Sequence, residues 1–309
     1  MSAADKSRSS RQPGLTVVVA FHDMRRQARR TLFSLSRDYQ EGVEDLAYEV
    51  LAVDNGSAEP LAAAEVTAFG PEFRHEFFAS TSVSPCAALN HAVSQARYDC
   101  VMVAIDGARL LSPGLLALAA RALGSVHRPF VLTLGMHLGP RVHNELVAAG
   151  FTSEDESDLL ASIDWRRSGY GLFGISSLAL SSREGFYSEL SESNCFALRL
   201  EDYEALGGFD ERFVSPGGGL ANLDIFNRAM AEPDLEPVML LGEATFHQQH
   251  GGVATEAPPS AHPWPEFIAE YEAIHGVPYA PVWRQPTYFG PRREECAALY
   301  VEDGESAEG

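Results

Sequence analysis

The chain has 309 residues, of which 23 are Lys or Arg and 43 are Asp or Glu, so its formal net charge is -20. This charge argues against a protein that coats nucleic acid or an anionic membrane, because both partners need a cationic surface. Hydrophobic residues make up 45% of the sequence, which is enough for a packed core and excludes a chain that is disordered throughout.

Short apolar runs alternate with amphipathic stretches in the first half of the chain. Residues 15–21 (LTVVVAF) and 48–53 (YEVLAV) are rich in β-branched residues, which predicts buried strands. Further strands are predicted at 73–79 and 100–105, and helices at 24–35, 61–69, 84–96 and 112–123. The last two helices begin with Ser-Pro, a typical helix start. This alternation predicts a doubly wound α/β sheet with right-handed crossovers.

The second half of the chain is less regular. The expected elements are a strand at 130–136, helices at 141–163 (with a break near Gly150), 201–206 and 220–231, and a short strand at 238–241. An apolar stripe from Trp264 to Ile274 predicts an amphipathic helix that ends at Gly276.

No linker divides the chain, so we expect one domain over 14–276 and a C-terminal strap over 277–300. Residues 1–13 are expected to form a disordered tail and 301–309 an acidic tail. The four cysteines show no CxxC spacing, and residues 1–14 contain no apolar segment of the kind found in a secretory signal peptide. These features predict a reduced, cytoplasmic protein without a transmembrane segment, and contact with a membrane surface stays open.

Polar residues follow three of the predicted strands at the point where each strand ends. They are His22-Asp23, Asp54-Asn55 and Asp106. Ligands of open α/β sheets bind beyond the carboxyl ends of the strands. An aspartate after a strand commonly only forms a turn, but three at successive strand ends favour a shared crevice.

Four segments resemble family 2 glycosyltransferases of the GT-A fold. They are VDNGS at 53–57, ALNHA at 88–92, IDGARLLSPGLL at 105–116 and LGGFDERF at 206–213. VDNGS alone is a weak signal, whereas the four segments in this order form a specific combination that covers roughly residues 15–252. The resemblance implies a GT-A, Rossmann-like doubly wound mixed sheet. It also implies transfer of a sugar from a nucleoside-diphosphate donor to an acceptor hydroxyl.

The resemblance assigns residues to the donor site. Ala20, Phe21 and His22 match the edge that contacts the base of the donor. Asp54 matches the carboxylate that bonds the nucleobase, usually uracil. Asn90 lies on the family's Asn-containing helix and is assigned to the same site.

The metal motif departs from the family pattern. Asp106 matches the first Asp of the family's DxD motif, near the diphosphate and the metal, but the second carboxylate falls at Ala108. Several GT-A enzymes supply a metal-bound histidine from the C-terminal region, and imidazole is a normal ligand for Mn²⁺. His247 and His250, expected in a loop, are therefore candidate ligands for Mn²⁺ or Mg²⁺. The alternative is two loop histidines without a ligand.

The catalytic base is the second departure. The family's acidic helix, which supplies the base of inverting members, falls at 221–225, where only Asp224 keeps an acid. Asn222 stands where a carboxylate is expected, and an amide cannot accept a proton at neutral pH. Asp224 is the first candidate base, and Glu192, in a region that borders the acceptor in the family fold, is the second.

These features together favour a metal-assisted, inverting glycosyltransferase that uses a UDP-, GDP- or dTDP-sugar and an unknown acceptor. The alternative is a non-catalytic nucleotide-sugar-binding or assembly protein of the same fold, which the missing acids at 108, 221 and 222 favour. A sugar-phosphate nucleotidyltransferase is disfavoured, because the loop at 21–25 contains no glycine to cradle a triphosphate.

Overall fold

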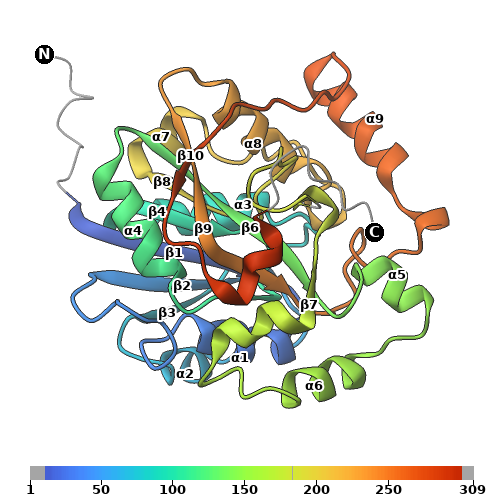
Figure 1. The fold of residues 1–309 in the computed structure, drawn as a ribbon. Helices are drawn as coiled ribbons and strands as arrows, with labels where there is room; N and C mark the ends of the chain where they lie inside the picture. The colour runs from blue at the N-terminus through green and yellow to red at the C-terminus, as the bar shows by residue number, and fades with distance from the viewer. Residues whose placement is uncertain (1–10, 183, 301–309) are drawn as a thin grey trace, which may run out of the picture.

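A ten-stranded mixed sheet runs through the protein, with helices on both of its faces (Figure 1). The computed structural model describes residues 11–182 and 184–300. The strand order is β10-β9-β6-β8-β4-β1-β2-β3, with β5 paired to β9 and β7 paired to β6. The strands are β1 (Gln12–Phe21), β2 (Tyr48–Asp54), β3 (Phe73–Phe77), β4 (Tyr98–Ala104), β5 (Arg109–Leu111), β6 (Pro129–Leu138), β7 (Ser176–Leu178), β8 (Cys195–Arg199), β9 (Glu236–His247) and β10 (Thr287–Phe289).

Helices cover the sheet on both faces, and the sheet separates two hydrophobic cores. The helices are α1 (Arg25–Ser34), α2 (Ala63–Thr67), α3 (Cys86–Ser94), α4 (Leu115–Ser125), α5 (His143–Ala148), α6 (Ser153–Ala161), α7 (Leu200–Ala205), α8 (Ala221–Ala231) and α9 (Trp264–His275). Val17 and Val19 of β1 belong to the core formed with α1, α2 and α4. Val18 and Ala20 belong to the core formed with α3, α7 and α8. Because both faces are buried, the strand is apolar throughout rather than alternating.

The predicted alternation of strands and helices over 15–123 is confirmed. β1 begins at Gln12, so residues 12 and 13 are strand rather than tail, while 1–10 and 301–309 lie outside the described residues. β9 extends to His247 and is much longer than the predicted 238–241. The expectation that His247 lies in a loop is therefore wrong, although His250 does follow the strand.

One strand reverses direction in the middle of the sheet. β8 is antiparallel to both β4 and β6, whereas β1 is parallel to β2 and β4, and β6 is parallel to β9. The carboxyl ends of β1, β4, β6 and β9 therefore share one edge with the amino end of β8. The register confirms this, because Cys195 at the start of β8 lies opposite Ala104, and His137 lies opposite His247.

The segment 277–300 lies along the far side of the sheet from β3. β10 pairs in parallel with β9. The Asn227 side chain donates to the Ala280 carbonyl (2.8 Å) and accepts from the Val282 amide (2.9 Å). Across the described ranges, no helix has the length and apolar character needed to cross a bilayer.

Candidate active site

A pocket of about 930 Å³ opens at the shared edge of the sheet. Its lining includes predicted residues from the end of β1, the turn after β4, the segment before β8 and the loop after β9. They are Ala20, Phe21, His22, Asp106, Glu192 and His250. This volume is at the upper end for a ligand pocket and is large enough for a nucleotide together with a second group.

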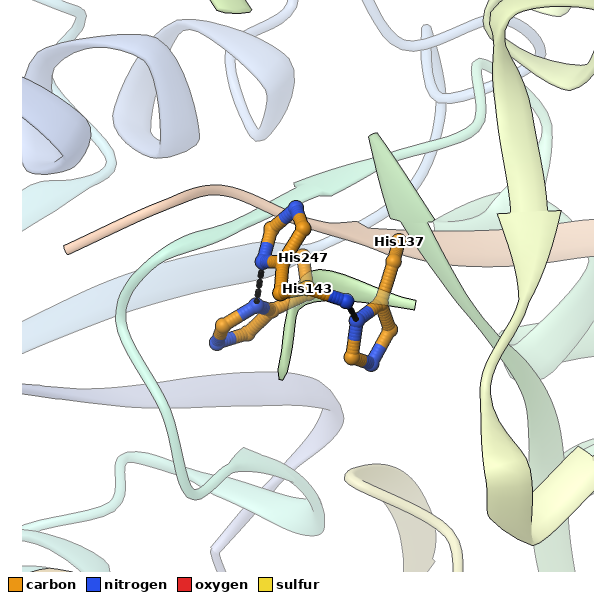
Figure 2. Close-up of side chains that lie close together, drawn as sticks. All are labelled: His137, His143 and His247. Atoms are coloured by element: carbon orange, nitrogen blue, oxygen red, sulfur yellow. Dashed lines mark hydrogen bonds between the residues drawn. The ribbon is translucent and has the colours of Figure 1, made fainter. Parts of the chain in front are cut away.

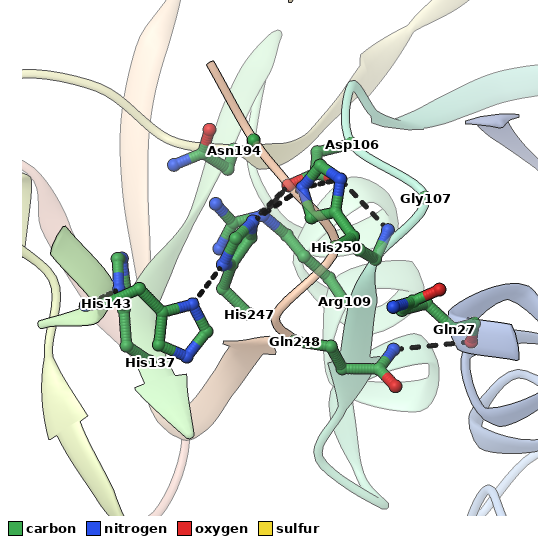
Figure 3. A network of polar contacts seen from close by, with 12 residues as sticks. Gln27, Asp106, Gly107, Arg109, His137, His143, Asn194, His247, Gln248 and His250 are labelled. Atoms are coloured by element: carbon green, nitrogen blue, oxygen red, sulfur yellow. Dashed lines mark hydrogen bonds and ion pairs between the residues drawn. The ribbon is translucent and has the colours of Figure 1, made fainter. Parts of the chain in front are cut away.

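Asp106 and His250 line this pocket, and His247, which is fully buried and outside the lining, meets both of them (Figure 3). The Oδ2 atom of Asp106 lies 2.8 Å from Nε2 of His247, and its Oδ1 lies 3.7 Å from Nε2 of His250. The two histidine Nε2 atoms are 3.1 Å apart. One ligand atom from each residue lies within 4.8 Å of the other two, a spacing that fits coordination of a single ion.

Backbone contacts fix this triad in place. The Ala108 amide donates to Asp106 Oδ1 (2.9 Å), and the Ala108 carbonyl accepts from the Gln248 amide (2.7 Å). The Gln248 side chain is buried and donates to the Thr31 hydroxyl of α1 (3.1 Å). The Glu256 carboxylate accepts from the His250 amide (2.6 Å) and holds the loop closed. The turn after β4 and the end of β9 are thus joined directly.

The hydrogen-bond pattern leaves two acceptors facing each other at Asp106 and His247. Nε2 of His143 lies 2.9 Å from the Leu138 carbonyl oxygen, so it must carry a hydrogen. Nδ1 of neutral His143 then accepts from Nδ1 of His247, 2.9 Å away (Figure 2). Neutral His247 has spent its only hydrogen, so its Nε2 presents a lone pair to the Asp106 carboxylate. Two acceptors this close need a proton or a cation between them.

A cation fits this gap better than a proton. Burial lowers the pKa of His247 to about 3 even though Asp106 acts to raise it. Burial also lowers the pKa of His143, and it lowers the pKa of His137 well below the usual range. These imidazoles are therefore neutral at pH 7, the form that binds metals. One carboxylate with two imidazoles is a donor set that suits Mn²⁺ or another transition ion better than Mg²⁺.

Arg109 adds a fixed positive charge that sequence reasoning did not identify. It begins β5 directly opposite His247, its side chain is 2% exposed, and it lines the pocket. Its Nε lies 3.6 Å from Asp106 Oδ2. Among the described residues, neither Nε nor Nη1 has a hydrogen-bond partner. A buried guanidinium with free donors beside a pocket is suited to an anion. Its only sequence signal was an arginine inside an apolar strand.

Glu192, the second candidate base, lines the pocket. It precedes β8 and reaches the pocket because β8 runs antiparallel. Its Oε2 accepts from the Asn222 side chain (2.7 Å), and its Oε1 accepts from the Asn194 side chain (3.2 Å). Asn222, which stands where the family has an acid, therefore orients a carboxylate supplied by another segment.

Asp224 does not have the surroundings of a catalytic base. Its carboxylate is 2% exposed and lies outside the pocket lining. It forms an ion pair with Arg228 (2.7 Å) and lies 3.1 Å from Nε2 of His275. This placement does not support Asp224 as the base, because α8 turns its side chain toward Arg228 and the pocket lining does not include it.

Asp54 and Asn90 also lie outside the pocket lining. Asp54 forms a turn: its two carboxylate oxygens accept from the amides of Ser57 (2.8 Å) and Leu61 (3.4 Å). The neighbouring Asn55 lines the pocket instead, and its Oδ1 has no partner within residues 11–182 and 184–300. These contacts place Asp54 in a turn and away from the pocket, so they do not support its assignment to the donor site.

Asn90 instead organises the GGFDERF turn. Its Nδ2 donates to the Phe209 carbonyl (2.8 Å), and its Oδ1 accepts from the Phe209 amide (2.9 Å) and the Tyr203 hydroxyl (2.8 Å). The turn is close-fitting, because a Cβ on Gly208 would lie 2.6 Å from Asn90 Oδ1. Two of the four sequence segments that suggested the family, ALNHA and LGGFDERF, are therefore packed on each other.

Comparisons with known proteins support the fold. No family model and no curated protein matches the chain. The S. aureus TarS fragment 1–349 in complex with UDP is similar with a TM-score of 0.50 and 15% identity, over 76% of this chain and 60% of that one. TarS in a longer form gives the same TM-score and identity, over 76% of this chain and 37% of that one. Mannosyltransferase PcManGT from Pyrobaculum calidifontis, in complex with GDP-Man and Mn²⁺, gives 0.47 and 16%, over 87% and 66%.

This chain spans only about 60% of the length of the TarS fragment. At 15% identity the likeness concerns the fold alone. The structure is a single-domain, mixed α/β protein with the fold of its glycosyltransferase neighbours, as the GT-A resemblance implied.

Proposed function

We propose that this protein transfers a sugar from a nucleoside-diphosphate donor to an acceptor hydroxyl. One observation carries the proposal: a single pocket is lined by two members of a triad suited to a cation and by a buried guanidinium whose donors lack partners among the described residues. With neutral histidines, the charges of Asp106 and Arg109 cancel. A divalent cation would bring the site to about +2, which matches the two negative charges of a diphosphate diester.

The donor lies with its base near the end of β1. Ala20, Phe21 and His22 line that part of the pocket, and the unpaired Oδ1 of Asn55 can accept from the base. The diphosphate lies against Arg109. A divalent cation held by Asp106, His247 and His250 would offset the charge that develops on the leaving diphosphate.

The reaction is a displacement at the anomeric carbon. Glu192 takes the proton of the acceptor hydroxyl, and the hydroxyl oxygen forms the new bond to carbon. The bond from carbon to the diphosphate oxygen breaks, and the nucleoside diphosphate leaves with the electron pair. Arg109 donates hydrogen bonds to the diphosphate as its charge grows. Attack from the face opposite the leaving group inverts the anomeric configuration.

Thermal unfolding with UDP, GDP and dTDP, with and without Mn²⁺, tests donor binding. A ligand at 100 times its dissociation constant adds roughly 2.7 kcal/mol of stability, or about 4 °C for a chain of this size. We expect one nucleotide to give this shift, and His247→Ala or His250→Ala to abolish the part that depends on Mn²⁺. No shift with any nucleotide would refute the proposal.

Slow hydrolysis of the matching nucleotide sugar separates an enzyme from a binding protein. Release of nucleoside diphosphate without an acceptor should require the cation and Glu192. Binding without any hydrolysis or transfer would instead identify a non-catalytic nucleotide-sugar-binding protein of the same fold.

A further inference from the structure

Exposed apolar side chains line the same pocket. Seven large apolar side chains are exposed within the described part of the chain, and four of them line this pocket. The four are Val83, Leu180, Val253 and Trp264. They come from four separate segments, before α3, in the region preceding β8, after β9 and at the start of α9. Apolar side chains that converge on one pocket mark a binding site rather than scattered surface.

Tyr279 connects these apolar side chains to the proposed base. Its ring lies 6.2 Å from that of Trp264, nearly perpendicular at 88°. Its hydroxyl is buried and has no hydrogen-bond partner among the residues the structure describes. Burial, and then the Glu192 carboxylate, raise the pKa of Tyr279 to about 12. The hydroxyl therefore stays protonated, remains free to donate and lies close enough to Glu192 to be affected by its charge.

The pocket lining thus combines the polar groups of Glu192 and Tyr279 with the apolar side chains of Trp264 and Val253. We infer that the acceptor is an amphiphilic alcohol, with its hydroxyl at Glu192 and an alkyl or aromatic body against Trp264 and Val253. The role of this ligand as acceptor rests on the proposed function, whereas the binding of an amphiphilic alcohol does not. The apolar side chains surround a pocket rather than a protruding face, so the ligand is a soluble amphiphile rather than a lipid held in a bilayer.

Calorimetric titration with two glucosides tests whether the apolar side chains of the lining bind an alkyl chain. n-Octyl β-D-glucopyranoside, below its micellar concentration, and methyl β-D-glucopyranoside share a sugar and differ in the alkyl chain. We expect the octyl compound to bind at least tenfold more tightly and with a larger negative heat-capacity change, the marker of apolar burial. Trp264→Ala and Val253→Ser should each weaken the octyl compound at least fivefold without changing the methyl compound.

Val214→Ser is the matched control, because Val214 is 62% exposed but lies outside the pocket lining. Equal affinity for both glucosides, or an equal loss in the control, would overturn the inference. Co-sedimentation with phosphatidylcholine vesicles should leave the protein in solution, and binding to the vesicles would overturn the choice of a soluble ligand. If UDP binds but octyl glucoside does not, the acceptor inference fails alone. If octyl glucoside binds but no nucleotide does, the proposed function fails alone.

Discussion

Arg109 offers a direct test of the anion site. Its Nε and Nη1 atoms have no hydrogen-bond partner in residues 11–182 and 184–300, so a bound diphosphate can satisfy at least one of them. A hydrogen bond to a charged group contributes about 1.5–3 kcal/mol. Arg109→Met should therefore weaken UDP binding by roughly 10- to 150-fold. Arg109→Lys keeps the charge but loses the planar fork, so we expect an intermediate loss.

Stability distinguishes this effect from damage to the fold. In the absence of ligand, Arg109 is a buried charge whose nearest carboxylate oxygen is 3.6 Å away. Removing one partner of a buried ion pair leaves the other charge uncompensated, which destabilises the fold. The free Arg109→Met protein should therefore unfold at a lower temperature than the parent, and UDP affinity is compared at a temperature at which both proteins are folded.

Calorimetric titration of UDP in the presence of Mn²⁺ measures the loss. Arg29→Met is the matched control, because Arg29 is exposed, pairs with Glu65 and lies outside the pocket lining, while its removal changes the net charge equally. Unchanged UDP affinity in Arg109→Met would refute the placement of the diphosphate. An equal loss in both variants would show that net charge, rather than a contact, controls binding.

Two further predictions concern the base and the buried histidines. Glu192→Gln should lower turnover by about 10²–10⁴-fold with unchanged UDP affinity, whereas Asp224→Asn should lower the unfolding temperature and leave turnover nearly intact; the opposite pattern would restore Asp224 as the base. The folded-state pKa of His247 is depressed to about 3. As pH drops through about 6.5, the unfolded chain therefore binds a proton at this histidine that the folded chain does not bind. The free energy of unfolding consequently falls as pH drops from about 7 toward 3. With EDTA present, urea unfolding at pH 7 and pH 5 should show His247→Gln losing about 2 kcal/mol less than the parent over this interval, and equal losses would contradict a neutral His247.

Much of the fold could be predicted from local patterns, but the direction of β8 could not. The run Cys195–Arg199 is only five residues long and follows a polar loop, so nothing in it signals a strand. Even a recognised strand carries no mark of its direction, because pairing depends on the rest of the sheet. That direction brings Glu192 to the edge where β1 and β4 end, a placement that the sequence pattern alone does not reveal.

The assignments of Asp54 to the base of the donor and of Asp224 to proton transfer lack structural support for different reasons. An aspartate after a strand serves equally as ligand or turn former, and only the amide of Ser57 at 2.8 Å decides the matter for Asp54. For Asp224 a local signal did exist. Arg228 follows it by four residues on the same helix, a spacing at which opposite charges pair.

Two of the three positions that lack the acids of the resembled family, Ala108 and Asn222, show a common physical logic. At Ala108 the missing carboxylate leaves Asp106 as the only acid of the triad, and the adjacent Arg109 cancels its charge. Two carboxylates alone would repel a diphosphate until a cation arrives, whereas this site is close to neutral and already holds a donor for the anion. Neutral imidazoles can then complete the ligand set without restoring negative charge. At Asn222 the side chain has changed from acid to donor, and it holds the Glu192 carboxylate at 2.7 Å. In both places another segment supplies the functional group that the motif lacks, imidazoles near Ala108 and a carboxylate near Asn222, so departures from a motif do not by themselves indicate an inactive site.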